Sequence, residues 1–486
     1  MLALLAFIAA DVPLSGFVSN RAQLAAASEL SLLSTKDRPM LADLVELNLQ
    51  GGARLLDDKL RFGGDASGFF SLAAGYADAD AATGALTLQN DDGKHALSSA
   101  NVSLSELWLS LEPFEHLVIT VGKKRTLWGP GLAFSPTDLL NPTRDPTDPS
   151  LQRAGFVQAR LDLPFERFTL SALFAPAVLA EQDAIPTQLL IDEDDQLHYA
   201  AALRIYALIG DADVNAWLLW SNRYSDDLEN KPRLALTLSQ SLFGIHELHA
   251  EVLLQTGSAR ATVNPECVTT QQSLALCVLR GTDLLTHDLL ASKLLLPDIL
   301  FGWRSMPEDG SQIAIEYLYQ ADGYLRAEYD DVTRLLAFVG QAQRAGVDVA
   351  LPATSGGGVP ARVSFNPLRR HYLALSYTRP QLLDDFTISS TLITPLEDLS
   401  MLLSGSLSWQ AEQWLTLTLL GFVPLVSPAR ASADTSSDPW QALFEAVDPQ
   451  WRGFVPRGAL VQGVPVGEFD GAPFRAQLMF EAKAFF

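Results

Sequence analysis

The chain of 486 residues has no uninterrupted apolar run of the roughly 18 residues that a membrane-spanning helix needs. This absence is notable because 48 % of the residues are hydrophobic. Helix-forming heptads and internal repeats of solenoid length are also missing, and no linker divides the chain. If the protein crosses a bilayer, it must therefore do so with strands in a closed barrel.

Basic residues and cysteines are both scarce. The chain has 34 Lys and Arg against 57 Asp and Glu, a formal net charge of −23, which argues against a nucleic-acid partner, since that would need a basic patch. The two cysteines, Cys267 and Cys277, lie close together in a polar stretch. An oxidising compartment would join them in a small disulfide, and two free thiols are the alternative. His/Cys clusters that could hold a metal are absent nearby, so no metal or cofactor is expected.

The sequence also lacks the nucleophile elbow of hydrolases, Gly-x-Ser-x-Gly. His246, His249 and His371 are single candidates for a catalytic base, with no nucleophile that the sequence places beside them. His249 shares a strand face with Glu247 and Glu251, a pattern more typical of a polar network inside a barrel. We therefore expect a protein without enzymatic activity.

The last stretch, residues 473–486, alternates, and Phe485 breaks the pattern only at the end. Its apolar positions are Phe474, Ala476, Leu478, Phe480, Ala482, Ala484 and Phe486. A period of two indicates a strand with one apolar face, in a soluble sandwich or in a membrane barrel. A terminal amphipathic strand that ends in phenylalanine resembles the C-terminal signature of Gram-negative outer-membrane β-barrels. The resemblance implies that Phe480 and Phe486 belong to a signal read by the barrel-assembly machinery.

The first ten residues are apolar and end in small side chains, as in the core of a signal peptide, but no basic residue precedes them. Residues 1–10 are thus predicted to be a signal peptide, whose missing basic residue a start codon called too late would explain, and 11–486 a single barrel domain. The alternative is that residues 1–10 begin the first strand.

Alternation along the chain predicts about 18 strands. They are 14–24, 44–56, 60–76, 104–111, 117–125, 155–163, 168–175, 196–208, 214–220, 234–242, 248–254, 296–303, 313–319, 372–378, 386–393, 401–409, 415–422 and 474–486. If the short turns share one end, every long connection falls at the other, and both termini lie with the short turns. This sorting and an even strand number favour an all-β, transmembrane, antiparallel up-and-down barrel with short periplasmic turns and long extracellular loops. Aromatic residues beside the short turns would form an interfacial belt.

A barrel of this size is too wide to be filled by its own side chains, so a loop is the candidate constriction. The connection 128–152 contains five prolines and is too stiff to continue the strands. Its candidate constriction residues are Trp128, Asp138, Arg144, Asp145 and Asp148, with Arg153 just beyond. The alternative is that this loop only caps the outer mouth.

Alternation also indicates which charged and polar side chains face the lumen. The candidates are Arg61, Glu106, Lys124, Arg160, His198, Arg204, Glu247, His249, Glu251 and Glu316. Both signs occur, which favours a general or weakly cation-preferring pore for small polar or charged solutes. A dedicated exporter or importer of one polymer or solute and a non-conducting surface scaffold are the alternatives.

A strand that ends in Gly122-Lys123-Lys124-Arg125, runs into Trp128-Gly129 and is followed by Asn141-Pro142 resembles the large outer-membrane barrels of the alginate-export and porin-type group. In that group the strand usually reads Gly-Arg-Gln, where this chain has Lys123 and Lys124. The resemblance implies a channel or exporter integral to the Gram-negative outer membrane.

Acidic stretches at 191–195, 225–229 and 328–331 fall in the long connections. They would keep the outer surface solvated, or they would bind lipopolysaccharide through divalent cations. Expected partners are thus outer-membrane lipid, lipopolysaccharide, the assembly machinery and small solutes.

Overall fold

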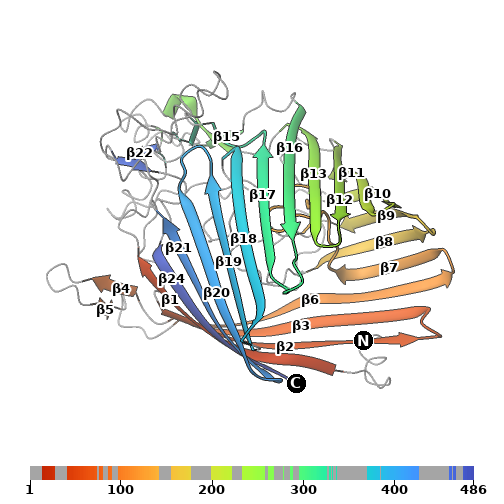
Figure 1. The fold of residues 1–486 in the computed structure, drawn as a ribbon, viewed down its shortest axis with the longest axis horizontal. Coiled ribbons are helices and arrows are strands. Elements are labelled where there is room, and N and C mark those ends of the chain that lie inside the picture. Colours follow the sequence, from red (N-terminus) through yellow and green to blue (C-terminus); the bar gives the residue numbers. More distant parts are fainter. Residues whose placement is uncertain are drawn as a thin grey trace.

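The computed structural model shows an 18-stranded antiparallel sheet that closes on itself. β1 (Leu14–Ala27) pairs with β2 (Leu41–Leu55) on one side and with β24 (Phe474–Phe485) on the other. In Figure 1 the red β1 lies beside the blue β24. Closure leaves no unpaired sheet edge in the barrel. The all-β up-and-down barrel expected from the sequence is confirmed.

The structure describes most strands and parts of the connections. The described residues are 14–27, 41–73, 76–79, 86–89, 97–141, 155–176, 199–221, 232–257, 261–267, 277, 285–287, 295–325, 328–329, 331, 335, 369–383, 385–425, 459–461, 464–466 and 474–486. The predicted signal peptide, residues 1–10, lies outside this set and stays a prediction.

The remaining barrel strands follow one another as antiparallel neighbours. They are β3 (Leu60–Ala73), β6 (Leu97–Phe114), β7 (Leu117–Lys124), β8 (Phe156–Pro164), β9 (Phe168–Pro176), β10 (Tyr199–Ile209), β11 (Ala212–Ser221), β12 (Arg233–Leu242), β13 (His246–Thr256), β16 (Leu295–Ser305), β17 (Gln312–Gln320), β18 (His371–Leu382), β19 (Phe386–Pro395), β20 (Met401–Glu412) and β21 (Leu415–Leu425). Most begin or end within a few residues of the sequence prediction, and β6 is longer.

As predicted, every long connection falls at one end of the barrel, which also carries the five-residue turn 396–400. One end of the barrel, the short-turn end, carries 56–59, 115–116, 165–167, 210–211, 243–245, 306–311, 383–385 and 413–414. The other, the long-connection end, carries 28–40, 74–96, 125–155, 177–198, 222–232, 257–294, 321–370, 396–400 and 426–473. Both the start of β1 and the end of β24 lie at the short-turn end.

Small elements in the long connections were not predicted. Three hairpins form there: β4 (Tyr76–Ala79) with β5 (Leu86–Gln89), β14 (Ala261–Val263) with β15 (Leu285–His287), and β22 (Ala459–Val461) with β23 (Val464–Val466). A 3-10 turn at Pro265–Cys267 carries one half of the disulfide between Cys267 and Cys277, whose Cα atoms are 5.9 Å apart. The disulfide alternative is thus the one that the structure shows.

Alternation gives each strand an apolar outer face and a smaller or more polar inner face. On β12, Leu234, Leu236 and Leu238 are exposed, while Ala235 and Thr237 between them are buried. A closed barrel with an apolar outer band is matched to the hydrocarbon of a bilayer. Among the described residues, no helix is long and apolar enough to span a membrane.

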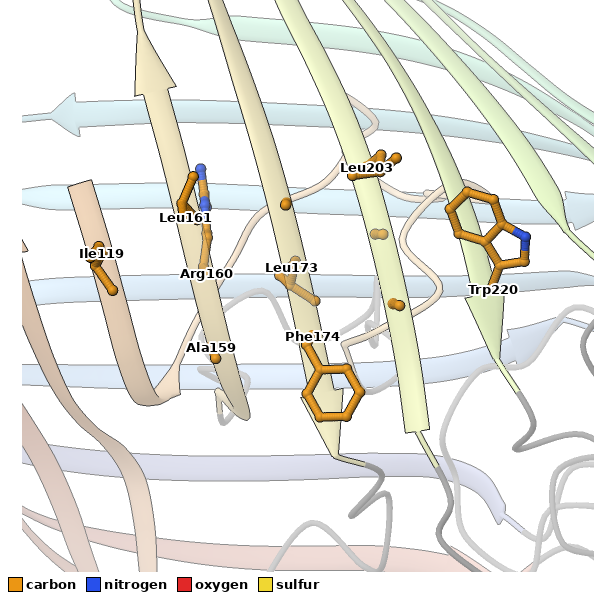
Figure 2. A pocket seen from close by; sticks show the side chains of 11 residues that line it. Ile119, Ala159, Arg160, Leu161, Leu173, Phe174, Leu203 and Trp220 are labelled. Atoms are coloured by element: carbon orange, nitrogen blue, oxygen red, sulfur yellow. The ribbon is translucent and has the colours of Figure 1, made fainter. Parts of the chain in front are cut away.

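The outer face is not smooth. A hollow of about 430 Å³ lies over β7 to β11, and Figure 2 shows Ile119, Leu161, Phe174, Leu203 and Trp220 among its lining side chains. Alanines at 159, 172 and 201 leave the space between these large residues. The hollow is therefore part of the lipid-facing surface.

Aromatic side chains collect at the short-turn end, as predicted. The exposed ones include Phe114, Phe165, Phe243, Trp414 and Phe486. Large amphipathic or apolar rings at this height are typical of the boundary between lipid and water.

Candidate functional site

The residues that follow β7 lie against the inner wall of the barrel. We call residues 126–141 the inner segment. Its Trp128 is buried against Trp217 of β11, with ring centroids 5.1 Å apart, and its Phe134 lies 5.9 Å from Tyr372 of β18. Trp217 pairs with the inward-facing Ala235, and Tyr372 is fully buried next to the exposed Leu373. The inner segment therefore crosses the inner wall from β11 to β18.

Glu316 of β17 holds the inner segment by its backbone. The Oε1 atom accepts a hydrogen bond from the N–H of Leu132 at 2.6 Å. The Oε2 atom accepts from the N–H groups of Ala133 at 2.7 Å and Phe134 at 3.2 Å. Successive N–H groups that converge on one carboxylate form an anion-binding nest, and bonds to an ionised acceptor are stronger than neutral ones. Glu316 is almost fully buried beneath this nest.

Glu251 of β13 makes a second attachment. It accepts from the N–H of Gly131 at 2.8 Å and from the Oγ1–H of Thr137 at 2.6 Å. The N–H of Thr137 adds a longer bond of 3.3 Å. We call Glu251 and Glu316 the anchor carboxylates. Together they accept hydrogen bonds from five backbone N–H groups of the inner segment, so the segment's position is set by the wall.

Two glycines permit this close approach. Gly129 has a φ of +82°, a conformation that side-chain-bearing residues rarely adopt. A Cβ at Gly129 would overlap the carboxylate of Glu251, and one at Gly131 would overlap the carbonyl of Phe134. The Trp128-Gly129-Pro130-Gly131 run thus fits the backbone geometry that the anchor carboxylates require.

His249 extends the attachment along the wall. Its Nε2 lies 2.8 Å from Glu316 Oε1, and its Nδ1 lies 3.9 Å from Glu247 Oε1. Glu247 forms an ion pair with Arg304 of β16 and accepts from the hydroxyl of Ser239 at 3.0 Å. The predicted lumen residues Glu247, His249, Glu251 and Glu316 therefore form one connected network on the inner face.

A second charged network lies on β2, β3 and β6. Arg125 donates to Asp65 Oδ2 at 2.6 Å, and its backbone N–H donates to Glu106 Oε1 at 2.9 Å. Asn48 donates to the other oxygen of Asp65 at 2.6 Å. A hollow of about 1140 Å³ opens beside this network, with Arg61 and Trp108 also in its lining.

Cations follow the inner faces of β7 to β10. Lys124 places its ammonium 3.8 Å from the ring centroid of Trp108. Arg204 donates to the amide oxygen of Asn215 at 3.0 and 2.5 Å. Arg160 differs because it forms an ion pair with Asp162 at 2.8 Å. Within the described part of the chain, the closest contacts of Lys124 and Arg204 are thus with neutral groups, while Asp162 acts electrostatically on both cations and Glu106 acts on Lys124.

The other predicted site residues have varied positions. Asp138 is half-buried, and its Oδ1 accepts a hydrogen bond from the side-chain amide of Asn141 at 2.6 Å. Its carboxylate therefore binds a neighbour within the inner segment. Arg61 lies near the short-turn end, 3.6 Å from Glu112. Five candidates lie outside the described residues and stay predictions: Arg144, Asp145, Asp148, Arg153 and His198.

Phe480 and Phe486, predicted to form the assembly signal, are both exposed on the terminal strand. The backbone of Phe486 exchanges two hydrogen bonds with Gly16, at 3.0 and 3.1 Å. The last residue therefore takes part in closing the barrel, and its role in assembly is not tested by this contact.

Sequence reasoning missed several groups of the site. Trp217 was not singled out, because an apolar position on a strand could equally well face lipid. The N–H groups of residues 131–134 carry no signal of their own, although the two glycines and the proline nearby indicated an unusual backbone.

Comparison with known proteins gives a likeness of fold. No protein-family model matches the chain, and no curated protein sequence matches it. Among solved structures, Pseudomonas aeruginosa OccK9 (OpdG) matches with a TM-score of 0.51 at 12 % identity, covering 98 % of both chains. Pseudomonas aeruginosa OpdK, solved with vanillate, gives 0.49 at 10 % identity over 98 % of both chains. Acinetobacter baumannii OccAB3 gives 0.48 at 9 % identity, over 98 % of this chain and 99 % of its own. The chain is thus an integral membrane β-barrel with the fold of Gram-negative outer-membrane porins.

Proposed function

We propose that the protein is an outer-membrane channel for small polar or charged solutes, and that the loop 128–152, of which the structure describes residues 128–141, is its constriction. The observation that carries this proposal is the attachment of the inner segment to the two anchor carboxylates. Side chains alone do not fill a barrel of about 18 strands, so its lumen holds water except where a segment folds inward. A segment that is bound to the wall narrows the cross-section of the lumen by a constant amount and leaves the rest of the lumen open.

The charges of the inner face support a preference for anions. The anchor carboxylates are buried under backbone N–H groups and are already satisfied. Lys124 and Arg204 instead keep their charges beside neutral partners. Fixed charges along a narrow pore set its ion preference. The general or weakly cation-preferring pore that the mixed composition of the strands suggested is the alternative.

The finer alternatives have less support. The resemblance of Trp128-Gly129 and Asn141-Pro142 to alginate-export-type barrels would make the channel a dedicated exporter, but no described contact favours a polymer. We infer the assembly machinery and lipopolysaccharide as partners from Phe486 and from the acidic connections. We also infer that the channel has no enzymatic activity, with which its likeness of fold to OccK9 (OpdG) agrees.

Reversal potentials in planar bilayers test the proposal. The purified protein should open discrete channels, and a salt gradient should reveal anion preference. Arg204→Gln should shift the reversal potential toward cation preference, more strongly at low salt, where screening is weak. Arg167→Gln is a matched control, because it removes one charge from the exposed turn 165–167. A protein that reconstitutes without current would be a scaffold, and the channel proposal would be wrong.

A further inference from the structure

Leu127 differs from the rest of the inner segment in its exposure to solvent. Among residues 126–141, all of which the structure describes, it is the one exposed side chain. Leu127 is 78 % exposed, whereas its neighbours Thr126 and Trp128 are 5 % and 4 % exposed. The attachment that buries the residues on either side of Leu127 therefore leaves its own side chain uncovered.

The contacts of the two neighbours fix the direction of this side chain. Gln158 of β8 donates to Thr126 Oγ1 at 3.0 Å, and Trp128 packs on Trp217 of β11. Both neighbours thus point into the wall, and Leu127 between them points away from it. Because the closed sheet surrounds the inner segment, the side away from the wall is the lumen.

An exposed leucine inside the barrel has different surroundings from those on the strands. Leu234, Leu236 and Leu238 of β12 face lipid, but Leu127 faces a lumen that holds water in a barrel of this width. With so little of its side chain buried, Leu127 adds little to the attachment of the inner segment. The contact left for it is with the solute that passes the segment.

Cations lie close to Leu127. Lys124 precedes it by three residues, and the guanidinium of Arg204 lies 5.9 Å from the ring centroid of Trp128, the next residue in the chain. A solute that passes the inner segment therefore meets charged groups and an apolar group near one another. The charged groups act on the polar part of the solute, and Leu127 removes water from its apolar part.

We propose that Leu127 is a specificity-determining residue of the channel, which gives solutes with an apolar body an advantage over polar solutes of the same size. The inference rests on the proposed channel function. A contact made at the constriction lowers the free energy of the solute there, and it raises the rate of passage provided that it is weak enough for the solute to leave. One leucine side chain provides such a weak contact.

Liposome swelling with the free amino acids valine and threonine tests the inference. The two are zwitterions of nearly the same shape, and they differ in a methyl group against a hydroxyl group. With the unmodified protein, valine should enter about twofold to fourfold faster than threonine, the effect of removing about one methyl-sized group from water. Because neither solute carries a net charge, the ratio does not depend on the ion preference of the channel.

Leu127→Asn keeps the approximate size of the side chain and removes its apolar end, so the ratio of the two rates should fall to about one. Leu127→Met keeps an apolar side chain and should keep the ratio. Leu56→Asn is the matched control: Leu56 is 69 % exposed in the turn 56–59, with a φ of +54° that asparagine tolerates. Its ratio should equal that of the unmodified protein.

The outcomes separate the two proposals. Absence of swelling with valine, threonine and the smaller glycine would remove the channel function. Entry of glycine without valine, equal rates for valine and threonine, or the unmodified ratio in Leu127→Asn would overturn the role of Leu127 and leave the channel function standing. If Leu127→Asn fails to assemble, the unmodified ratio in Leu127→Ala overturns the inference as well.

Discussion

Glu397 is a single residue that joins two connections at the long-connection end. It lies in the turn 396–400, and its Oε1 accepts the backbone N–H groups of Arg370 and His371, each at 2.9 Å. Its other oxygen is buried without a hydrogen-bond partner. Burial raises the pKa of this carboxyl to about 7, against the opposing effect of Arg369.

The stability of this contact should depend on pH. The folded-state pKa of Glu397 is above the ordinary value of 4.5. The contribution of the protonated carboxyl to the free energy of unfolding is therefore full below pH 4.5 and is lost as the pH rises to about 7. We expect the unfolding temperature of the protein to fall between pH 5 and pH 8. Glu397→Gln should remove that part of the fall, and Glu308→Gln, in the turn 306–311, should leave it unchanged. An identical pH profile in Glu397→Gln would show that the carboxyl titrates in its ordinary range.

At the residue scale, alternation predicted which wall side chains face inward but not what they bind. Glu251 and Glu316 are placed on the inner face by the period of two alone. Their partners are backbone N–H groups, which every residue but proline has, at positions 120 and 183 residues away in the chain. Sequence patterns hold no signal for such a contact, so the cap at the mouth stayed open as an alternative to the inward loop.

Among the elements, the terminal strand and β1 decide whether the barrel closes. Phe486 is hydrogen-bonded to Gly16, and a Cβ at Gly16 would meet the Phe486 ring at 2.9 Å. Phe17 and Phe485 pack edge to face at 6.1 Å. The strand therefore contributes both backbone pairing and apolar surface at the seam.

Phe486→Asp should reduce assembly of the barrel. A charge at this exposed terminal position weakens the apolar signal and brings a cost of solvation near lipid. We expect synthesis to continue while the heat-modifiable form in the outer membrane decreases. Phe243→Asp, another exposed aromatic at the short-turn end, is the control. Normal amounts of the heat-modifiable Phe486→Asp protein would contradict the assembly role.

The disulfide stabilises one connection rather than the barrel. Cys267 and Cys277 are separated by 10 residues, for which loop closure contributes about 3 kcal/mol. Replacing both with serine should make the connection 257–294 more sensitive to protease. Heat-modifiability of the barrel should not change, because none of its strands lies between the cysteines. A large loss of assembled barrel would show that this connection takes part in folding of the sheet.

Strands and turns were predictable because each carries its own signal, alternation or a polar break, over several residues. The three hairpins inside the long connections were not, since strands of three or four residues are too short for a period to be detected. Pairing of β1 with β24 follows from closure of the whole sheet, and neither sequence alone specifies its register.

For the whole molecule, the sorting of connections predicts an orientation. Long loops of bacterial outer-membrane barrels are extracellular, and short turns are periplasmic. Cysteine labels at Ala79 or Gly356, in long connections, should react with an impermeant reagent on intact cells. Labels at Asp58 or Glu412, beside short turns, should react only after the membrane is opened. The reverse pattern would contradict the orientation and leave the barrel intact.

The central claim is that a wide barrel is narrowed by the inner segment and its anchor carboxylates. Glu251→Gln with Glu316→Gln tests it, because an amide nitrogen cannot accept the N–H groups, and each bond to a charged acceptor contributes about 1.5–3 kcal/mol. The loss of these hydrogen bonds should detach the inner segment from the wall of the barrel.

The most direct measurement is the single-channel conductance of this double variant beside the unmodified protein, with Glu112→Gln as a control at the short-turn end. We expect discrete openings in all three, with higher conductance and passage of larger solutes only in the double variant. An assembled double variant with the conductance and solute limit of the unmodified channel would show that the inner segment does not set the width of the pore.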